Sequence, residues 1–148
     1  MTEVVFRHEG VLDKYIGDAI MAVFGVPVHR EDHARRAVAA ALEMRDEHAR
    51  FVRTLEPAMR FQMRIGVNTG EVVAGYMGSV RRMEYTVLGM PVVIAKRLES
   101  LAEGDTVYVG HDTYVMSAQY FDYESLPKVR MPKGDGEIEV YKALEVKK

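Results

Sequence analysis

Hydrophobic and polar positions alternate with different periods along the chain, and each period predicts an element. Two β-prone runs joined at a Gly-Asp pair predict a hairpin over residues 11–24. Between Asp32 and Pro57, hydrophobic residues recur at spacings of three and four, which predicts one amphipathic helix. Residues 59–67 then alternate with a period of two, which is typical of a half-buried strand. The first half of the chain is therefore expected to fold as a hairpin, a helix and a strand.

The second half combines strands and helices in a different order. The expected elements are two strands at 71–75 and 84–88 around a loop, a helix at 91–101, a strand at 106–109, a helix at 111–117 and a hairpin of 128–131 and 138–144. The sequence has no internal repeat, and its order does not follow the strict βα alternation of a doubly wound fold. These patterns favour the α+β class, with a mixed sheet and helices mostly on one of its faces.

Composition narrows the functional classes. A chain of 148 residues fits one domain, expected over residues 1–148, and its 48% hydrophobic and 28% charged residues are average for a globular protein. A net charge of −2 gives no general attraction for nucleic acid. The sequence has no cysteine, no signal peptide and no apolar run of the roughly 20 residues that a spanning helix needs. We therefore expect a cytoplasmic protein that neither binds nucleic acid nor spans a membrane.

Five stretches of the chain carry a family resemblance. Residues 12–25, LDKYIGDAIMAVFG, closely resemble the second metal-binding segment of class III adenylyl and guanylyl cyclase catalytic domains. Four further stretches resemble the same family in the same order, at 31–38, at 64–75, at 85–89 with 95–99, and at 132–141. The resemblance extends from about Val4 to Leu144. One such motif would be weak, but five in register identify the chain as a member of this family.

The resemblance implies a fold, a reaction and a set of partners. The fold is a ferredoxin-like βαββαβ-type nucleotide cyclase core with a mixed sheet, and two copies form a homodimer that shares nucleotide sites across its interface. The reaction is attack of the ribose 3′-hydroxyl of ATP on the α-phosphate, which gives 3′,5′-cyclic AMP and diphosphate. Two Mg²⁺ or Mn²⁺ ions are expected, because one can activate the hydroxyl while the other neutralises the leaving diphosphate.

Five residues match functional positions of the family. Asp18 matches a metal-binding aspartate, and Arg97 matches a catalytic arginine that reaches across the interface to the phosphates. Lys133 resembles a lysine that contacts phosphate. Lys14 and Thr86 match the pair that reads the purine base. A lysine only donates hydrogen bonds and a threonine can donate or accept, which fits N1 and N6 of adenine and favours ATP over GTP.

Four of these residues also have an ordinary structural explanation. Asp18 follows a glycine, as many turn aspartates do, and Thr86 is a β-branched residue in a predicted strand. Arg97 reads equally as a surface arginine, and Lys133 as part of a Lys-Gly turn. The structural and functional explanations both stay open at the level of the single residue.

Glycines and histidines add less to the functional prediction. Gly66, Gly70 and Gly75 are expected to serve backbone geometry and close packing instead of ligand contact. The five histidines show no spacing that is typical of a metal site.

The chain departs from the family pattern at three places. Only seventeen residues precede Asp18, so the family's first strand and its metal aspartate are missing. Val93 stands four residues before Arg97, where the family has an asparagine that hydrogen-bonds in the transition state. The usual Gly-Asp after the base-reading strand is Gly89-Met90. One metal carboxylate and one catalytic amide are therefore absent from this sequence.

These departures leave two functional hypotheses. The first is an adenylate cyclase catalytic domain, truncated or diverged, and the second is a non-catalytic cyclase homology domain that dimerises or binds nucleotide to regulate a partner. The missing strand belongs in the middle of the family's sheet, so its neighbours would have unpaired edges. Strand exchange, a tight dimer, another chain or an upstream part of a longer protein, which could also carry a sensor or regulatory domain, would fill the gap. A diguanylate cyclase is disfavoured because its Gly-Gly-Asp/Glu-Glu-Phe motif is absent.

Overall fold

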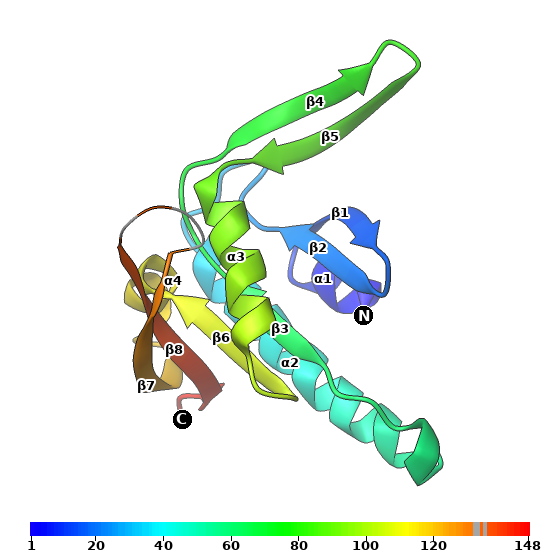
Figure 1. The fold of residues 1–148 in the computed structure, drawn as a ribbon, viewed down its shortest axis with the longest axis vertical. Helices are drawn as coiled ribbons and strands as arrows, with labels where there is room; N and C mark the ends of the chain where they lie inside the picture. Colours follow the sequence, from blue (N-terminus) through cyan, green and yellow to red (C-terminus); the bar gives the residue numbers. More distant parts are fainter. Residues whose placement is uncertain (132–133, 135) are drawn as a thin grey trace.

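The computed structural model describes residues 1–131, 134 and 136–148. Helices and strands alternate along the chain (Figure 1). In chain order they are α1 (Thr2–Arg7), β1 (Val11–Ile16), β2 (Ala19–Val23), α2 (His33–Arg53), a 3-10 turn (Pro57–Met59), β3 (Arg64–Val67), β4 (Val73–Ser79), β5 (Arg82–Leu88), α3 (Met90–Leu101), β6 (Thr106–Gly110), α4 (His111–Ser117), β7 (Phe121–Arg130) and β8 (Glu137–Val146).

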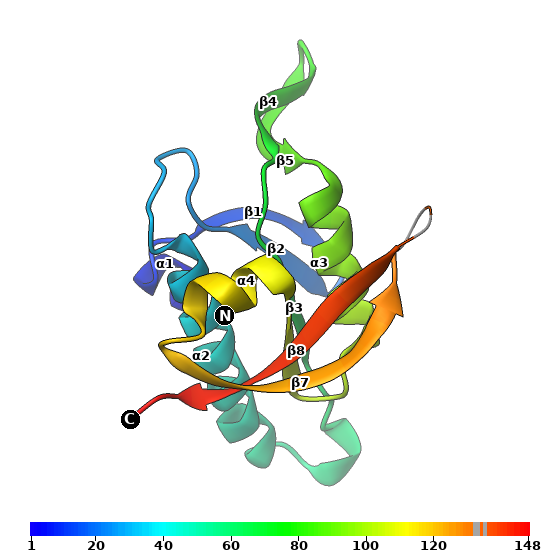
Figure 2. The same cartoon turned by 90° about the vertical axis from the view of Figure 1, so that its left-hand side faces the viewer.

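The main sheet has four strands in the order β3-β6-β8-β7. β3 and β6 run parallel, while β6 with β8 and β8 with β7 are antiparallel, so the sheet is mixed as the sequence predicts. The expectation that helices lie mostly on one face holds for α2 and α4, while α3 covers the other face. Val107 and Val109 of β6 pack with α2, whereas Tyr108 between them packs with Leu98 of α3. β6 is buried on both faces because α2 and α4, which lie together, cover one and α3 covers the other (Figure 2).

Two hairpins lie outside the main sheet. β1 and β2 form the predicted hairpin, whose turn contains Gly17 at a φ of 61° followed by Asp18. β4 and β5 form a second hairpin that extends away from the other strands (Figure 1). Among the described residues, β2 pairs only with β1, and β3 only with β6. The described strands thus form three separate sheets.

Three element boundaries differ from the prediction. Residues 76–79 and 82–83, which we expected in a loop, belong to β4 and β5 because the ladder continues to the pair Ser79 and Arg82. β3 begins only at Arg64, and Met59 of the predicted strand is 66% exposed with no strand beside it. β7 begins at Phe121, before the predicted hairpin, because its ladder with β8 extends through both strands.

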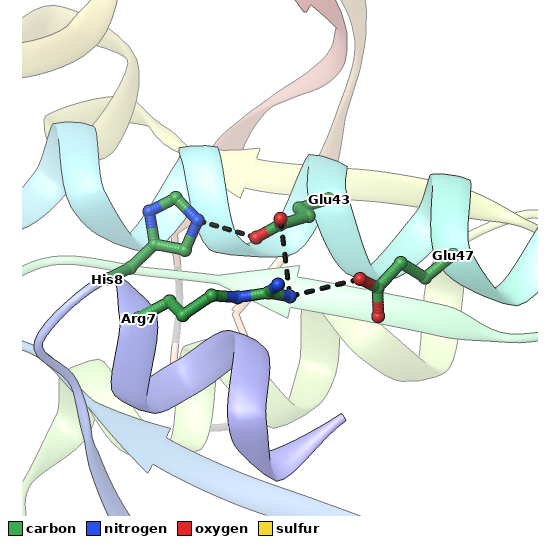
Figure 3. A network of polar contacts seen from close by, with 4 residues as sticks. All are labelled: Arg7, His8, Glu43 and Glu47. Carbon is green, nitrogen blue, oxygen red and sulfur yellow. Dashed lines mark hydrogen bonds and ion pairs between the residues drawn. The ribbon is translucent and has the colours of Figure 1, made fainter.

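The N-terminal helix α1 was not predicted. Val4 and Val5 are fully buried, which anchors its apolar side. Its polar end contacts α2, where Arg7 binds Glu47 at 3.0 Å and Glu43 at 3.3 Å (Figure 3). Next to it the His8 ring lies 2.7 Å from Glu43 (Figure 3). The apolar and ionic contacts together hold α1, and through it the start of β1, against the body of the protein.

Candidate active site

The β1-β2 hairpin presents Asp18 at its tip. The turn requires a left-handed backbone at Gly17, which glycine adopts without steric cost. The Asp18 side chain is exposed and makes no hydrogen bond or ion pair with another residue in the described part of the chain. Its carboxylate is therefore available to a ligand, and four residues earlier Lys14 lies half-buried on β1.

Thr86 connects the two hairpins. It lies on β5 and is only 8% exposed, and its hydroxyl donates a hydrogen bond of 2.9 Å to the Asp13 carboxylate of β1. Asp13 is the extra residue of a β-bulge, since Leu12 and Lys14 pair with the adjacent Ala22 and Met21. The structure thereby brings Thr86 beside β1, the strand that carries Lys14.

Asp13 is a residue that the sequence analysis missed. A charged side chain inside an otherwise apolar strand, directly before a predicted base-reading lysine, was the available signal. Strict alternation would place neighbouring side chains of a strand on opposite faces, and only the bulge, a tertiary feature, changes the direction of one of them.

Arg97 lies on the exposed side of α3. Its neighbour Lys96 binds Glu99 at 2.9 Å, whereas Arg97 itself has no ion pair among the residues that the structure describes. Val93 is 42% exposed one turn before Arg97, and Met90 is also exposed. Residues at these spacings share one helix face, so an arginine and two apolar residues are open to a partner or ligand.

The predicted residues make no direct polar contact with one another in the described part of the chain. No hydrogen bond or ion pair joins Arg97 of α3 to Lys14, Asp18 or Thr86 in the described chain. Lys133 lies outside the described residues. The structure thus groups the base-reading candidates on the two hairpins and keeps the arginine on a separate element.

A large hollow lies away from these residues. It measures about 580 Å³ and opens between the start of α3, the start of α4 and the β7-β8 hairpin. None of Lys14, Asp18, Thr86 or Arg97 lines it. A much smaller hollow lies at the Asp13 and Thr86 contact.

Among the described residues, Asp18 is the candidate metal ligand. No group of three or more histidine or carboxylate side chains is close enough there to hold an ion. Magnesium in nucleotide sites is commonly held by one or two carboxylates together with phosphate oxygens. Asp18 fits as one such ligand because its carboxylate is exposed at a hairpin tip. None of the helices described is long and apolar enough to cross a membrane.

Comparison with known proteins identifies the family. Residues 4–144 match the model of the adenylate and guanylate cyclase catalytic domain. The chain belongs to this family. An uncharacterized protein of Mycobacterium tuberculosis H37Rv is 36% identical over 118 residues, which cover 74% of this chain and 21% of that protein. The cyclase domain described here thus corresponds to about a fifth of the length of that relative.

Solved structures of cyclases share this fold. The guanylyl cyclase Cya2 superposes with a TM-score of 0.92 at 28% identity, covering 99% of this chain and 75% of that one. The adenylyl cyclase CyaB from P. aeruginosa gives 0.88 at 27% identity, covering 97% and 76%. These matches confirm the predicted α+β cyclase fold. One neighbour is named for each base, so the likeness alone does not choose between ATP and GTP.

Proposed function

We propose that this cyclase domain converts ATP to 3′,5′-cyclic AMP and diphosphate at the interface of a homodimer. The observation that carries the proposal is the hydrogen bond from Thr86 of β5 to Asp13, the residue next to Lys14 on β1. The two residue types lie on adjacent hairpins, as a site that contacts two neighbouring atoms of one base requires.

Adenine suits this pair better than guanine. The Lys14 ammonium has three hydrogens and no free lone pair, so it needs an acceptor such as N1 of adenine. The Thr86 oxygen can accept from the 6-amino group of adenine. Guanine presents a donor at N1 and an acceptor at O6, which would leave the lysine facing a hydrogen.

In this proposal Asp18 binds the metal ions, and Arg97 and Lys133 contact the phosphates. Bound Mg²⁺ or Mn²⁺ would lower the pKa of the ribose 3′-hydroxyl and neutralise charge on the leaving diphosphate. Asp18 would hold such ions together with phosphate oxygens, since its exposed carboxylate has no competing cation in the described chain. Arg97 would donate its guanidinium hydrogens to the phosphates as charge develops on them.

A second copy of the chain would bring Arg97 to the hairpins. Arg97 is exposed on α3 and has no ion pair in the described residues, so it is free to serve a neighbouring subunit. The β4-β5 hairpin offers further apolar surface, with Val80 at its tip 99% exposed and Val73 and Met83 exposed along it. Exposed apolar surface of this kind is typical of an interface. Because its proposed substrate ATP is a cytoplasmic nucleotide, we place the proposed enzyme in the cytoplasm. A longer protein could carry a sensor or regulatory domain upstream of it.

A regulatory domain without catalysis is the second candidate. The observation that favours it is Val93, whose exposed side chain stands where the resemblance expects an asparagine and offers no hydrogen bond. Such a domain would bind nucleotide or a second subunit without turning nucleotide over.

Cyclic AMP production separates the two candidates. We expect the purified chain, with manganese and ATP, to form cyclic AMP and to have the mass of a dimer on the same sample. A folded dimer without product would favour the regulatory domain. Extending the chain upstream by a strand that carries a metal aspartate then gives product only if the domain is catalytic.

The base preference is tested at Lys14. Replacing it with glutamate puts an acceptor where N1 of adenine needs a donor, so we expect the ratio of ATP to GTP turnover to fall by about tenfold or more. The matched control is Lys142→Glu, which reverses the charge of a lysine on β8 that lies 3.7 Å from Glu124. An unchanged ratio in Lys14→Glu would remove Lys14 from base reading.

A further inference from the structure

The Asp13 carboxylate decides what the Thr86 hydroxyl can offer to a ligand. An ionised carboxylate only accepts hydrogen bonds, so the 2.9 Å contact has to use the one hydrogen of the Thr86 hydroxyl. Two lone pairs then remain on the oxygen, and Thr86 can only accept. A threonine without this partner could rotate its hydrogen and serve either a donor or an acceptor.

Local structure holds this arrangement in place. Thr86 is buried and paired with Gly75 in the β4-β5 ladder, so its backbone is fixed. Asp13 is the extra residue of the β1 bulge, and bulges commonly serve to redirect a side chain. The apolar residues Val11 and Val87 line the small hollow at this contact, where Thr86 is buried and Asp13 half-buried. A hydrogen bond in such surroundings strongly prefers its paired state.

We infer that Asp13 is a positioning residue that sets the base preference of the site by holding Thr86 as an acceptor. The inference rests on the proposed function, in which Thr86 meets the 6-position of the purine. A fixed acceptor suits the 6-amino group of adenine and opposes the 6-oxo group of guanine or hypoxanthine, since two acceptors would then face each other. Asp13 thus selects against the wrong base without touching it.

Two non-reacting nucleotides measure this preference. The 3′-deoxy forms of ATP and ITP lack the attacking hydroxyl, so their binding can be followed without turnover. Their bases differ only at the 6-position and at the N1 hydrogen, which leaves the 2-amino group of guanine out of the comparison. Binding to the full chain is measured with manganese present, and the ratio of the two dissociation constants is the readout.

The variants separate positioning from packing. Asp13→Ala removes the partner, and Asp13→Leu keeps much of its shape without an oxygen that could accept from Thr86. We expect both to reduce the preference for 3′-deoxy-ATP by about tenfold, chiefly through tighter binding of 3′-deoxy-ITP. In a Thr86→Val background, Asp13→Ala should change the ratio no further, because Asp13 acts through the hydroxyl. Asp122→Ala, at an exposed site on β7, is the matched control.

The outcomes distinguish this inference from the proposed function. A wild-type chain that binds neither nucleotide, or binds both equally, overturns the assignment of ATP and the role of Asp13 with it. A wild-type preference for 3′-deoxy-ATP that survives in Asp13→Ala and Asp13→Leu overturns only the role of Asp13. Equal weakening of both nucleotides would mean that Asp13 merely supports the fold. If Asp13→Ala does not fold, the ratio for Asp13→Leu decides.

Discussion

Replacing Asp18 with alanine is expected to reduce manganese-dependent cyclic AMP formation by at least about 100-fold while leaving the fold intact, because a carboxylate that holds the catalytic ions acts mainly on the reaction. The side chain is exposed at a hairpin turn and has no partner in the described chain, so its removal breaks no internal contact. Its neighbour Gly17, which supplies the turn's left-handed backbone, is unchanged. The measurement is the initial rate of product formation, with the melting temperature taken on the same preparation.

The isosteric variant Asp18→Asn is the matched control for shape. It keeps the size of the side chain and loses the charge, so we expect the same loss of rate as with alanine. Binding of 3′-deoxy-ATP should also lose its dependence on manganese in both variants. Full activity in either variant would remove Asp18 from the metal site, and a lower melting temperature would assign it a structural role.

Local patterns predict those elements of this fold whose signals lie within a short segment. The Gly17-Asp18 turn, the long helix α2 and the helix α3 all follow from residues that are neighbours in sequence. Their signals are a turn dipeptide and a helical period, and both act over a few residues. The α+β class then follows from their order, and the solved cyclase structures confirm it.

The errors arose where strand pairing or helix docking decides the structure of a segment. Glycine and arginine at the tip of the β4-β5 hairpin read as a loop, yet the ladder continues to Ser79 and Arg82. Met59 alternates correctly for a strand and has no partner strand there. Helix α1 is only six residues long, too short for a clear period, and it is held by contacts with α2. Strand pairing and helix docking are tertiary, so a pattern read along one segment does not contain them.

In the candidate site too, local signals could be predicted from the sequence and tertiary contacts could not. Asp18 at a turn and Lys14 four residues before it could be predicted from one motif. The contact between Asp13 and Thr86 joins residues 73 positions apart, and it depends on a bulge that the sequence does not signal. Arg97 lies on α3, outside both hairpins, and its role in the proposed function depends on a second copy of the chain, which a pattern along one segment does not describe.

Of the proposed substitutions, Gly66→Ala is expected to destabilise the fold most. It should lower the free energy of unfolding by about 3 kcal/mol. A methyl group at Gly66 would lie 2.5 Å from the backbone nitrogen of Glu99 and would collide with the Ala95 carbonyl, so the backbone of α3 crosses β3 with no room between them. A flexible side chain could move aside, but here the obstacle is a helix backbone. The free energy of unfolding in urea is the measurement.

Gly75→Ala is the matched control, since it makes the same change in a strand. A methyl group there meets nothing within 4 Å, so we expect a change within about 0.5 kcal/mol. Equal stability of the two variants would mean that α3 moves away from β3 at little cost. In that case Arg97, which α3 carries, would not be held at a fixed distance from the sheet. A large loss of stability in Gly66→Ala alone would instead show that the contact between β3 and α3 positions the helix face that carries Arg97.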